Sequence, residues 1–488
     1  MREGDMAMNR RDFLKAVGGL SALGAAAGCA TGGAGLCAGG SMSGFRCAPM
    51  DRIRIGFIGV GERGSAAVHR CSVFPGVETA AVCDIRQEAA EANISWLKEH
   101  GKPGAKRCYA GAADSWKRVC EDPGVDVVYI ATPAGLHYEE EVYALNCGKH
   151  VMVEVPGCQT IEQCWSVVEA CEKARRHCLM LENACYHDHE MLMWNMVHKG
   201  LLGTLTHAEG AYIHHLVWRH CEDSFRNLKT KAAGVSHRYG NGYPTHPLGP
   251  ICFYMDMNRG DRMEKIVSMS SLPAAHAEFC AVKYPPDAWQ NKHKWLTGDM
   301  NTSIIRTAKG RTIMLQYDLS TPRPYTRLNL IQGTKGCIAD FPLRMHLANR
   351  PGGDAEGWHN ADAHWMDEKT LAATVKKYEH PLWKRVGKAA KAFGGHGGCD
   401  FIMDLRWIYC LKEGLPLDMD VYDLAAWSSI VPCSAESDRR GGEPVMLPDF
   451  TRGAWATTKP ISIGDVDLEK MGLDLNAIRP DEVQYKVS

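Results

Sequence analysis

The stretch 53-IRIGFIGVGERG-64 decides the fold, because it joins a short apolar run to a glycine-rich turn. Gly59, Gly61 and Gly64 have the spacing that lets a backbone turn and approach a pyrophosphate at a helix N-terminus. A helical pattern follows, and a second apolar run, 77-VETAAVCD-84, then ends in an acidic residue. The order of strand, glycines, helix, strand and acid predicts a parallel α/β domain that binds a dinucleotide.

Asp84 indicates which dinucleotide this domain binds. In a Rossmann domain, an acidic residue at the end of the second strand accepts hydrogen bonds from the ribose hydroxyls of the adenosine. A carboxylate at that place disfavours a 2′-phosphate, so the sequence predicts NAD as the cofactor rather than NADP.

The alternation of strands and helices continues as far as residue 186. Apolar runs at 125–139, 148–156 and 178–186 predict further strands, and 160–177 has a helical pattern. Ligands of open α/β sheets bind at the carboxyl ends of the strands. We therefore expect four residues at such ends to line the cofactor cleft: Thr132, Glu154, Asn183 and Tyr186.

The second half of the chain has a different pattern. Strand-like segments predict an antiparallel or mixed sheet, with helices returning near 398–413 and 421–430. These strands are expected at 205–213, 265–271, 302–308, 311–319 and 327–334. The predicted fold class is α/β, with an N-terminal Rossmann domain followed by a C-terminal α+β domain whose sheet is mostly antiparallel. The expected bounds are 1–50 for a signal and flexible linker, 51–185 for NAD binding, 186–450 for substrate binding and oligomerisation, and 451–488 for a C-terminal tail.

Composition excludes several classes of function. The 488 residues are 45% hydrophobic and carry a net charge of -1, so a nucleic acid partner is not expected. No uninterrupted apolar run is long enough to span a membrane. The 20 cysteines include no Cys-x-x-Cys pair, and no Cys/His spacing suggests zinc or another metal, so we interpret them as mostly buried free thiols.

The N-terminal stretch 9-NRRDFLKAVGGLSALGAAAGCA-30 is typical of a twin-arginine export signal. Arg10 and Arg11 precede Phe13, Leu14 and a Gly/Ala-rich apolar run; the alternative is an amphipathic helix with a chance arginine pair. The run 26-AAGC-29 is also an imperfect lipoprotein box, in which Cys29 would carry the lipid. We therefore expect a protein exported to the periplasm after folding in the cytoplasm, with a lipid anchor left open.

The segment 240-GNGYPTHPLGP-250 places Tyr243 and His246 among glycines and prolines. We interpret it as a stiff loop that holds both side chains in place. A histidine has an ordinary pKa of about 6.5, which suits general acid and base catalysis near neutral pH.

Several of these motifs together resemble a known superfamily. The glycine turn, Asp84, Ala-Thr-Pro-x-x-x-His and Glu-x-Pro occur in the order found in the Gfo/Idh/MocA oxidoreductases, over residues 51–200. In most of those enzymes the last motif is Glu-Lys-Pro, with the lysine as a catalytic acid/base. This chain has 154-EVP-156, and Val155 cannot transfer a proton. The departure argues against an ordinary sugar dehydrogenase.

The rest of the chain resembles glycoside hydrolase family 109, the NAD-dependent α-N-acetylgalactosaminidases, over most of residues 51–450. The segments that carry the resemblance are 182-ENACY-186, 209-EGAYIHHL-216, 239-YGNGYPTHPLGP-250, 258-NRGDR-262, 268-SMSS-271, 322-PRPYTR-327, 332-QGTKG-336 and 395-GHGGCDFIMD-404. The implied activity removes terminal α-linked N-acetylgalactosamine with retention, through transient oxidation at C3, elimination and addition of water. The alternatives are an NAD-dependent sugar dehydrogenase and an exported sugar-binding protein.

The resemblance also implies site residues and a partner. NAD would contact the glycine turn and Glu62, Arg63, Asp84, Ala134, His137, Glu154, Val155 and Asn183. The implied substrate-binding residues are Tyr212, Tyr243, Pro244, Thr245 and Tyr325, and the implied catalytic residues are Tyr186, His246 and Arg226. Arg219 competes with Arg226, and it stays open whether Tyr186 or His246 acts at C2. The family's use of the second sheet for dimer contacts implies a homodimer.

Overall fold

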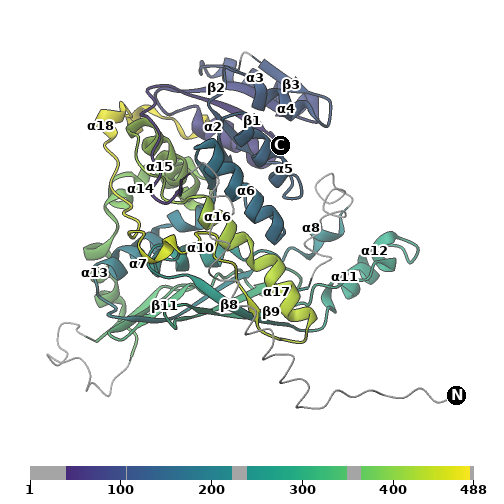
Figure 1. The fold of residues 1–488 in the computed structure, drawn as a ribbon, viewed down its shortest axis with the longest axis vertical. Helices are drawn as coiled ribbons and strands as arrows, with labels where there is room; N and C mark the ends of the chain where they lie inside the picture. The colour runs from purple at the N-terminus through teal and green to yellow at the C-terminus, as the bar shows by residue number, and fades with distance from the viewer. Residues whose placement is uncertain (1–39, 106, 223–238, 349–363, 484–488) are drawn as a thin grey trace, which may run out of the picture. The chain divides into compact units, whose positions relative to one another are not determined.

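A six-stranded parallel sheet forms the N-terminal half of the computed structural model, which describes residues 40–105, 107–222, 239–348 and 364–483 (Figure 1). The strand order is β3-β2-β1-β4-β5-β6, which confirms the predicted Rossmann domain. The strands are β1 (Ile53–Ile58), β2 (Val77–Asp84), β3 (Arg107–Ala110), β4 (Val127–Ile130), β5 (His150–Val153) and β6 (Cys178–Met180). The helices that connect them are α2 (Glu62–Cys71), α3 (Gln87–Glu99), α4 (Ser115–Glu121), α5 (His137–Asn146) and α6 (Ile161–Ala174).

The glycine turn after β1 needs two of its glycines for space. Gly59 has φ +82°, and a Cβ there would lie 2.8 Å from the main chain of Ala131 and Thr132. A Cβ on Gly64 would lie 1.9 Å from the carbonyl oxygen of Gly59. A side chain at Gly59 would therefore collide with the chain after β4, and one at Gly64 would push α2 away from the glycine turn.

The last strand of this sheet is shorter than the sequence predicts. We expected a strand over 178–186, but β6 ends at Met180 and a 3₁₀-helix, η1 (Asn183–Tyr186), follows it. The short strand β3 was not predicted, because its four residues are exposed or half-buried and lack an apolar pattern.

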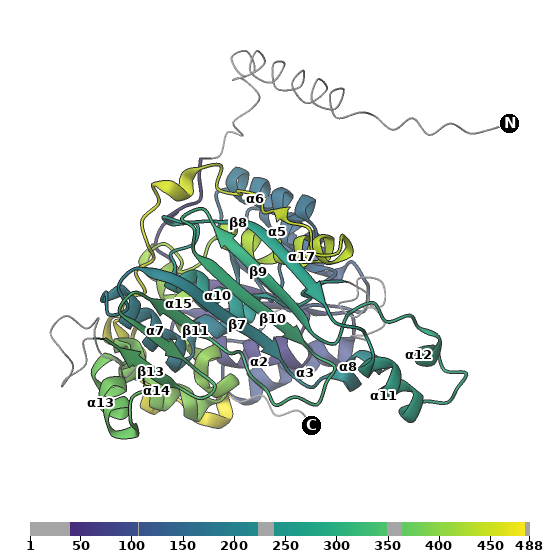
Figure 2. The same cartoon turned by 90° about the horizontal axis from the view of Figure 1, so that it is seen from below.

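An eight-stranded sheet forms most of the second half (Figure 2). Its order is β13-β12-β11-β7-β10-β9-β8-β14, and only β7 and β10 are paired in parallel within it, which confirms the mostly antiparallel prediction. The strands are β7 (Leu205–Ile213), β8 (Met263–Ser270), β9 (Asn301–Thr307), β10 (Thr312–Asp318), β11 (Leu330–Gly333), β12 (Gly336–Ala339), β13 (Arg344–Leu347) and β14 (Val445–Met446). Along β9 buried residues alternate with more exposed ones, as expected for a sheet with one covered face.

Helices cover one face of this sheet and connect it to the Rossmann domain. In Figure 2 the strands lie in front of α7 (Asp188–His198), α10 (Thr245–Tyr254) and α17 (Ile430–Arg439). Between α10 and α17 in the sequence, α15 (Cys399–Glu413) packs against α2 and α16 (Val421–Ser428) packs against α6. The other α-helices within the described residues are α8 (Val217–Cys221), α11 (Ala275–Lys283), α12 (Trp289–Lys292), α13 (Glu368–Tyr378), α14 (Pro381–Phe393) and α18 (Leu468–Met471).

Both ends of the described chain pack on the core, which corrects two sequence interpretations. Residues 41–50 were expected to be flexible linker, yet Met42 is buried and its N–H donates to the hydroxyl of Tyr422 over 3.0 Å. Residues 451–483 were expected to be a tail, yet Val466 and Met471 are buried in the core. The apolar side chains in these segments are spaced too irregularly to reveal their burial by periodicity.

Two features are absent from the described residues. None of the helices in residues 40–105, 107–222, 239–348 and 364–483 is long and apolar enough to cross a membrane. Across the same ranges, no three His, Cys, Asp or Glu side chains are grouped so that they could hold a metal ion. Four residues singled out from the sequence lie outside the described residues: Arg10, Arg11, Cys29 and Arg226.

Candidate active site

The turn between β1 and α2 has the form of a pyrophosphate site. Gly61 immediately precedes α2, and among the described residues no side chain caps the N-terminus of this helix. Glu62 is exposed on the first turn. Asp84 ends β2 at the neighbouring strand, where its carboxylate accepts a hydrogen bond from the N–H of Arg86 over 2.9 Å. The unpaired first-turn donors and the nearby carboxylate fit the diphosphate and ribose of NAD.

Asp400 brings three of the predicted cofactor residues together. Arg63 donates to Glu154 over 2.5 Å through Nε and to Asp400 over 2.7 Å through Nη1. The side-chain amide of Asn183 donates to the other oxygen of Asp400 over 2.7 Å. Burial alone would raise the pKa of Asp400, but Arg63, Arg70 and a hydrogen bond from His396 hold it well below its ordinary value. The network joins α2 to the ends of β5 and β6 and to α15.

His137 contacts main-chain carbonyls on both sides of its ring. Its Nδ1 lies 2.8 Å from the oxygen of Pro156 and its Nε2 lies 2.8 Å from the oxygen of Thr132. The side chain is fully buried, so it links the loops after β4 and β5 and is not itself presented to a ligand. Ala134 and Val155 are half-buried in those two loops, where a cofactor could reach them.

His246 forms a pair with a buried carboxylate that the sequence did not single out. Its Nδ1 lies 2.6 Å from Oε1 of Glu182, a residue with 0% of its side chain exposed. Glu182 also accepts the N–H of Ala184 over 3.0 Å, which fixes the carboxylate. A carboxylate at this place accepts the Nδ1 proton, so the lone pair of a neutral imidazole lies on Nε2. The His246 side chain is 17% exposed, so the pair combines a buried acid with a reachable base.

The segment that carries His246 is a helix rather than the stiff loop we expected. Helix α10 begins at Thr245, directly after Pro244. Pro247 falls in its first turn, where an N–H has no partner within the helix, and Pro250 costs it one hydrogen bond. A Cβ on Gly249 would lie 2.8 Å from Cγ of Glu182, so this glycine lets α10 approach η1. His246 is therefore held by a helix that packs closely against Glu182, the residue with which His246 pairs.

His246 belongs to an aromatic cluster, in which Tyr212 and Tyr243 lie against its ring and Tyr325 lies against Tyr212. The ring of Tyr212 lies 4.8 Å from that of Tyr243, 5.3 Å from His246 and 6.3 Å from Tyr325, measured between centroids. The ring of His214 lies 5.0 Å from that of Tyr325. The structure thus brings together residues 212, 243, 246 and 325, which the sequence had placed in one substrate site. Aromatic faces with hydroxyl edges are suited to a sugar ring.

Two further predicted substrate residues lie at the edge of this cluster and turn away from solvent. Pro244 is buried, and Thr245 has 0% of its surface exposed. They form the start of α10, beside the partly exposed side chain of His246.

Arg327 holds the hydroxyl of Tyr325 and was not predicted. Its Nη1 donates to that hydroxyl over 3.2 Å, while the same guanidinium forms an ion pair with buried Glu190. With Arg327 as donor, the phenolic proton of Tyr325 is free to point elsewhere. The sequence signal was available, since Arg327 ends the quoted segment 322-PRPYTR-327.

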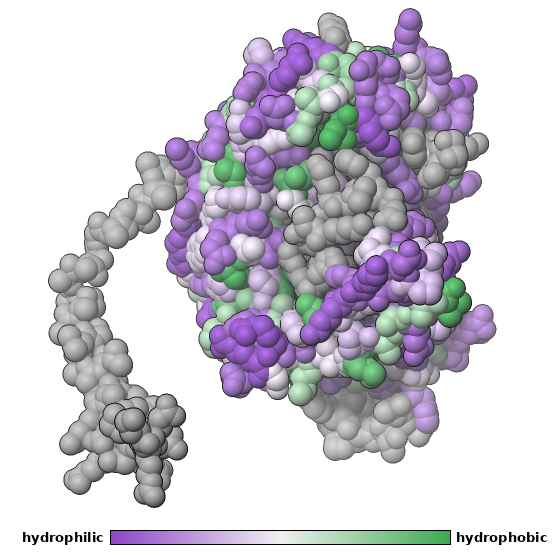
Figure 3. Space-filling view, turned by 90° about the vertical axis from the view of Figure 1, so that its right-hand side faces the viewer, coloured by the Kyte–Doolittle hydropathy of each residue, from purple (hydrophilic) through white to green (hydrophobic). Residues whose placement is uncertain are grey.

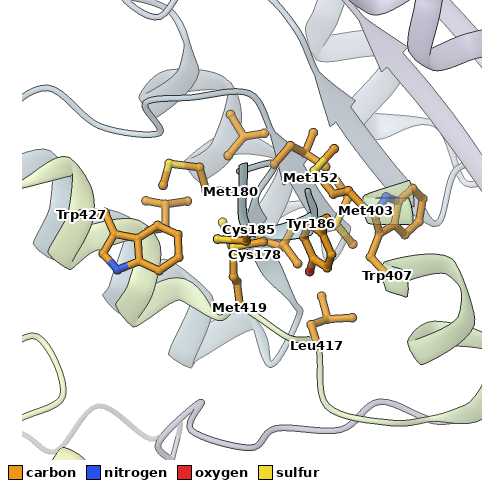
Figure 4. Close-up of a cluster of buried hydrophobic side chains, with 14 of the residues drawn as sticks. Met152, Cys178, Met180, Cys185, Tyr186, Met403, Trp407, Leu417, Met419 and Trp427 are labelled. Carbon is orange, nitrogen blue, oxygen red and sulfur yellow. The ribbon is translucent and has the colours of Figure 1, made fainter. Parts of the chain in front are cut away.

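Tyr186 lies in the core, which corrects its expected role in proton transfer. Its hydroxyl donates to Asp418 over 3.0 Å, and only 1% of the residue is exposed. Figure 4 shows its ring among buried apolar side chains that include Met403, Trp407 and Leu417. Burial raises the pKa of this phenol well above its ordinary value. Because β6 ends early, the η1 turn directs residue 186 inward and residues 182 and 183 toward the site.

The structure describes only one of the two candidate catalytic arginines. Arg226 lies outside the described residues. Its competitor Arg219 is in α8, with its guanidinium 4.9 Å from the ring centre of Trp218.

Two family models match the chain. Residues 53–182 match the oxidoreductase family with an NAD-binding Rossmann fold. Residues 186–457 match the C-terminal domain of glycosyl hydrolase 109, and this match covers more than half of the chain.

Full-length relatives agree with these models. Glycosyl hydrolase family 109 protein 2 of Shewanella sp. (strain ANA-3) is 43% identical over 461 residues, which cover 93% of this chain and 99% of that protein. The glycosyl hydrolase family 109 protein of Shewanella baltica (strain OS185) is 42% identical over 467 residues, with the same two coverages of 93% and 99%.

Solved structures share the fold at lower identity. Levoglucosan dehydrogenase in complex with NADH and levoglucosan superposes with a TM-score of 0.60 and 18% identity, covering 82% of this chain and 100% of that chain. An NAD binding oxidoreductase from Klebsiella pneumoniae gives a TM-score of 0.60 and 16% identity with the same coverage. These identities establish the fold alone. The family models and the full-length relatives confirm the resemblance stated from the motifs: the chain belongs to glycosyl hydrolase family 109 and has an NAD-binding Rossmann domain of the Gfo/Idh/MocA type.

Proposed function

We propose that the protein is an NAD-dependent glycosidase that removes terminal α-linked N-acetylgalactosamine with retention and without net redox change. The route is transient oxidation at C3, elimination of the anomeric substituent, addition of water and reduction at C3. The observation that carries the proposal is the Glu182–His246 pair within the cluster of Tyr212, Tyr243 and Tyr325. Family membership and the 93% coverage by named relatives support the glycosidase class.

The sugar site and the cofactor site share the η1 turn. Glu182 contacts His246 in the aromatic cluster, while the next residue, Asn183, contacts Asp400 in the network around Arg63. Adjacent residues on one turn therefore reach both sites. This arrangement supports a sugar bound next to the nicotinamide end of a cofactor held by the glycine turn.

Several residues of this chain would hold NAD. The first turn of α2 after Gly61 would bind the diphosphate, and Asp84 would accept from the ribose hydroxyls. Glu154 and Asn183, fixed by Arg63 and Asp400, would line the nicotinamide side. When bound, NAD supplies a reversible acceptor for the hydride of a sugar C–H bond.

His246 is the best-placed group for proton transfer at C2. A ketone at C3 makes the C2 proton acidic, and the Nε2 lone pair of His246 can remove it while Glu182 stabilises the imidazolium that forms. The bond from C1 to its substituent then breaks with its electron pair, and the departing oxygen takes a proton from solvent. Water adds to C1 and releases a proton to solvent, and the imidazolium returns its proton to C2. Val155 has no ionisable group, so His246 takes a role that a lysine has in the dehydrogenase relatives.

The tyrosines would bind and orient the sugar. The edge-to-face arrangement of Tyr212 and His246 leaves an aromatic wall beside the base. Tyr325, whose oxygen accepts from Arg327, can direct its proton to a sugar oxygen. A preorganised donor of this kind stabilises negative charge that develops on a substrate oxygen.

One assay tests the proposed activity against the dehydrogenase alternative. Purified protein is incubated with p-nitrophenyl α-N-acetylgalactosaminide without added NAD, and nitrophenol release and NADH absorbance are followed together. We expect many turnovers of nitrophenol per protein with no net NADH. Stoichiometric NADH without nitrophenol would reject the glycosidase and favour the sugar dehydrogenase.

Export by the twin-arginine route and a homodimeric state are also proposed. Export by the twin-arginine route would be tested by replacing Arg10 and Arg11 with lysine and comparing periplasmic and cytoplasmic fractions. Retention in the periplasm despite the replacement would reject that route.

A homodimer would be tested by sedimentation of the purified protein, where a monomer at micromolar concentration would reject it.

A further inference from the structure

Two cysteine thiols face each other in a small cluster beside the second sheet. Cys221 ends α8 and Cys280 lies in α11, and their Sγ atoms are 3.3 Å apart. Both residues have 0% of their surface exposed. The two positions are separated by 59 residues in the sequence. A disulfide has an S–S distance of about 2.05 Å, so a movement on the order of 1 Å would join them.

The cluster around these thiols is small and separate from the main core. It consists of Val217, Cys221, Cys280 and Trp295, with Phe279 and Tyr284 packed against it. Figures 1 and 2 place α11 and α12 together at one side of the eight-stranded sheet, next to α8. The surface seen from that side is mostly hydrophilic, with small separate hydrophobic patches (Figure 3).

Such a cluster has little intrinsic stability. Helix α8 has 5 residues and α12 has 4, which is too short for either to be stable without tertiary contacts. Units that bury little apolar surface commonly depend on a covalent cross-link. A bond between α8 and α11 would close a long loop, which is where a cross-link restricts the unfolded chain most.

We propose that Cys221 and Cys280 form a disulfide bond that ties α8 to α11. The oxidant is a disulfide, either on a thiol oxidase or on a small molecule such as oxidised glutathione. The thiolate of one cysteine attacks the oxidant and releases one thiol as the leaving group. The second cysteine, after losing its proton, attacks the mixed disulfide and releases the other thiol. Two electrons pass to the oxidant, and two protons leave the cysteines.

Access sets the rate of this reaction. Burial raises the pKa of both thiols, so little thiolate is present while the cluster is closed. Oxidation therefore proceeds when α8 and α11 separate transiently, and the bond formed prevents that separation afterwards. Because α8 follows β7, which carries Tyr212, the cross-link also restrains the chain that leaves the aromatic cluster.

Peptide mapping tests the proposal on the full chain. Purified protein is treated with oxidised glutathione, remaining thiols are alkylated, and a non-reducing digest is analysed by mass spectrometry. We expect a peptide pair linked through Cys221 and Cys280, and a loss of two titratable thiols in denaturant. Reduction should release the pair. The measurement needs no variant, so a folding defect cannot obscure it.

Variants provide the matched controls. Cys221→Ala and Cys280→Ala should each abolish the linked pair, whereas Cys337→Ala, at a half-buried thiol of β12, should retain it. In wild type, oxidation should slow proteolytic cleavage within α8 to α12 by about tenfold, since opening is prevented. Recovery of both cysteines as alkylated thiols, or linkage of either to a different cysteine, would overturn the proposal. None of these readouts depends on glycosidase activity.

Discussion

The Nδ1 atom of His246 lies 2.6 Å from Oε1 of Glu182, and this carboxylate is fully buried at the start of the turn that follows β6. The relationship sets the tautomer of the imidazole and couples α10 to the Rossmann sheet. A buried acid behind a reachable histidine is also the arrangement by which hydrolases of other folds hold a catalytic base.

Replacing Glu182 with Gln tests this coupling. The amide can no longer stabilise an imidazolium, so we expect kcat to fall by about 10²- to 10⁴-fold while NAD content stays unchanged. The nitrophenol assay measures kcat, and absorbance after denaturation measures bound NAD. His246→Ala alone should be as slow as the variant that combines Glu182→Gln with His246→Ala, because the two residues act as a unit. Activity within about twofold of wild type in Glu182→Gln would contradict the proposed role.

Tyr186 and Tyr325 should respond in opposite ways to the same change. Tyr186→Phe removes the donor to buried Asp418, so we expect a loss of about 1–3 kcal/mol in the free energy of unfolding with kcat nearly unchanged. Tyr325→Phe removes a hydroxyl from a residue that is 42% exposed, so we expect lower kcat or higher KM with little loss of stability. Thermal denaturation and steady-state kinetics separate the two effects. A large activity loss in folded Tyr186→Phe would restore that residue to the site.

Local patterns were sufficient to predict most of the sheets. The strand expected at 205–213 has the bounds of β7, and the glycine spacing at 59–64 predicted the turn before α2. Patterns failed where an element is short or only partly buried, as in β3 and β14. They also failed at α10, because glycines and prolines usually interrupt helices, whereas this helix packs closely against η1, β7 and α7.

The sequence predicted several residues of the site but not which of them form contacts with one another. Tyr212, Tyr243, His246 and Tyr325 were all named, and they do meet. Glu182 and Asp400 were missed because their partners are 64 and 337 residues away in the sequence, and no spacing rule joins positions that distant. Tyr186 was misplaced because a strand end was expected where the chain makes a 3₁₀ turn into the core.

Asp400 should stabilise the folded protein at neutral pH and lose this effect in strong acid. Its pKa is held well below the ordinary value of about 3.9, so the unfolded chain binds a proton that the folded chain does not. The stabilisation is therefore complete above the unfolded pKa and is lost as the pH falls through the folded pKa. We expect Asp400→Asn to lower the melting temperature at pH 7 and to flatten its decline below about pH 4. Unchanged melting curves across this range would contradict the assignment.

The same carboxylate should support cofactor binding through Arg63 and Asn183. Asp400→Asn is expected to weaken NAD binding by about 10- to 100-fold, because both partners lose a charged acceptor that fixes them. Calorimetric titration of the cofactor-depleted protein measures the affinity. Asp438→Asn, at a carboxylate that binds Gly240 and Ser270, is the matched control and should leave NAD affinity unchanged.

Asp84 and Arg86 should control the choice between NAD and NADP. Nε of Arg86 lies 3.3 Å from Oδ1 of Asp84, so the carboxylate that we propose for the ribose hydroxyls also pairs with the guanidinium. In Asp84→Ser, the repulsion of a 2′-phosphate is removed and Arg86 is released to bind it. We expect NADP affinity to rise at least about tenfold while NAD affinity falls, as measured by titration of the depleted protein. Adding Arg86→Ala to that variant should cancel the gain in NADP affinity, since the guanidinium supplies the phosphate contact. A gain that survives in the double variant would show that the missing carboxylate alone decides between the two cofactors.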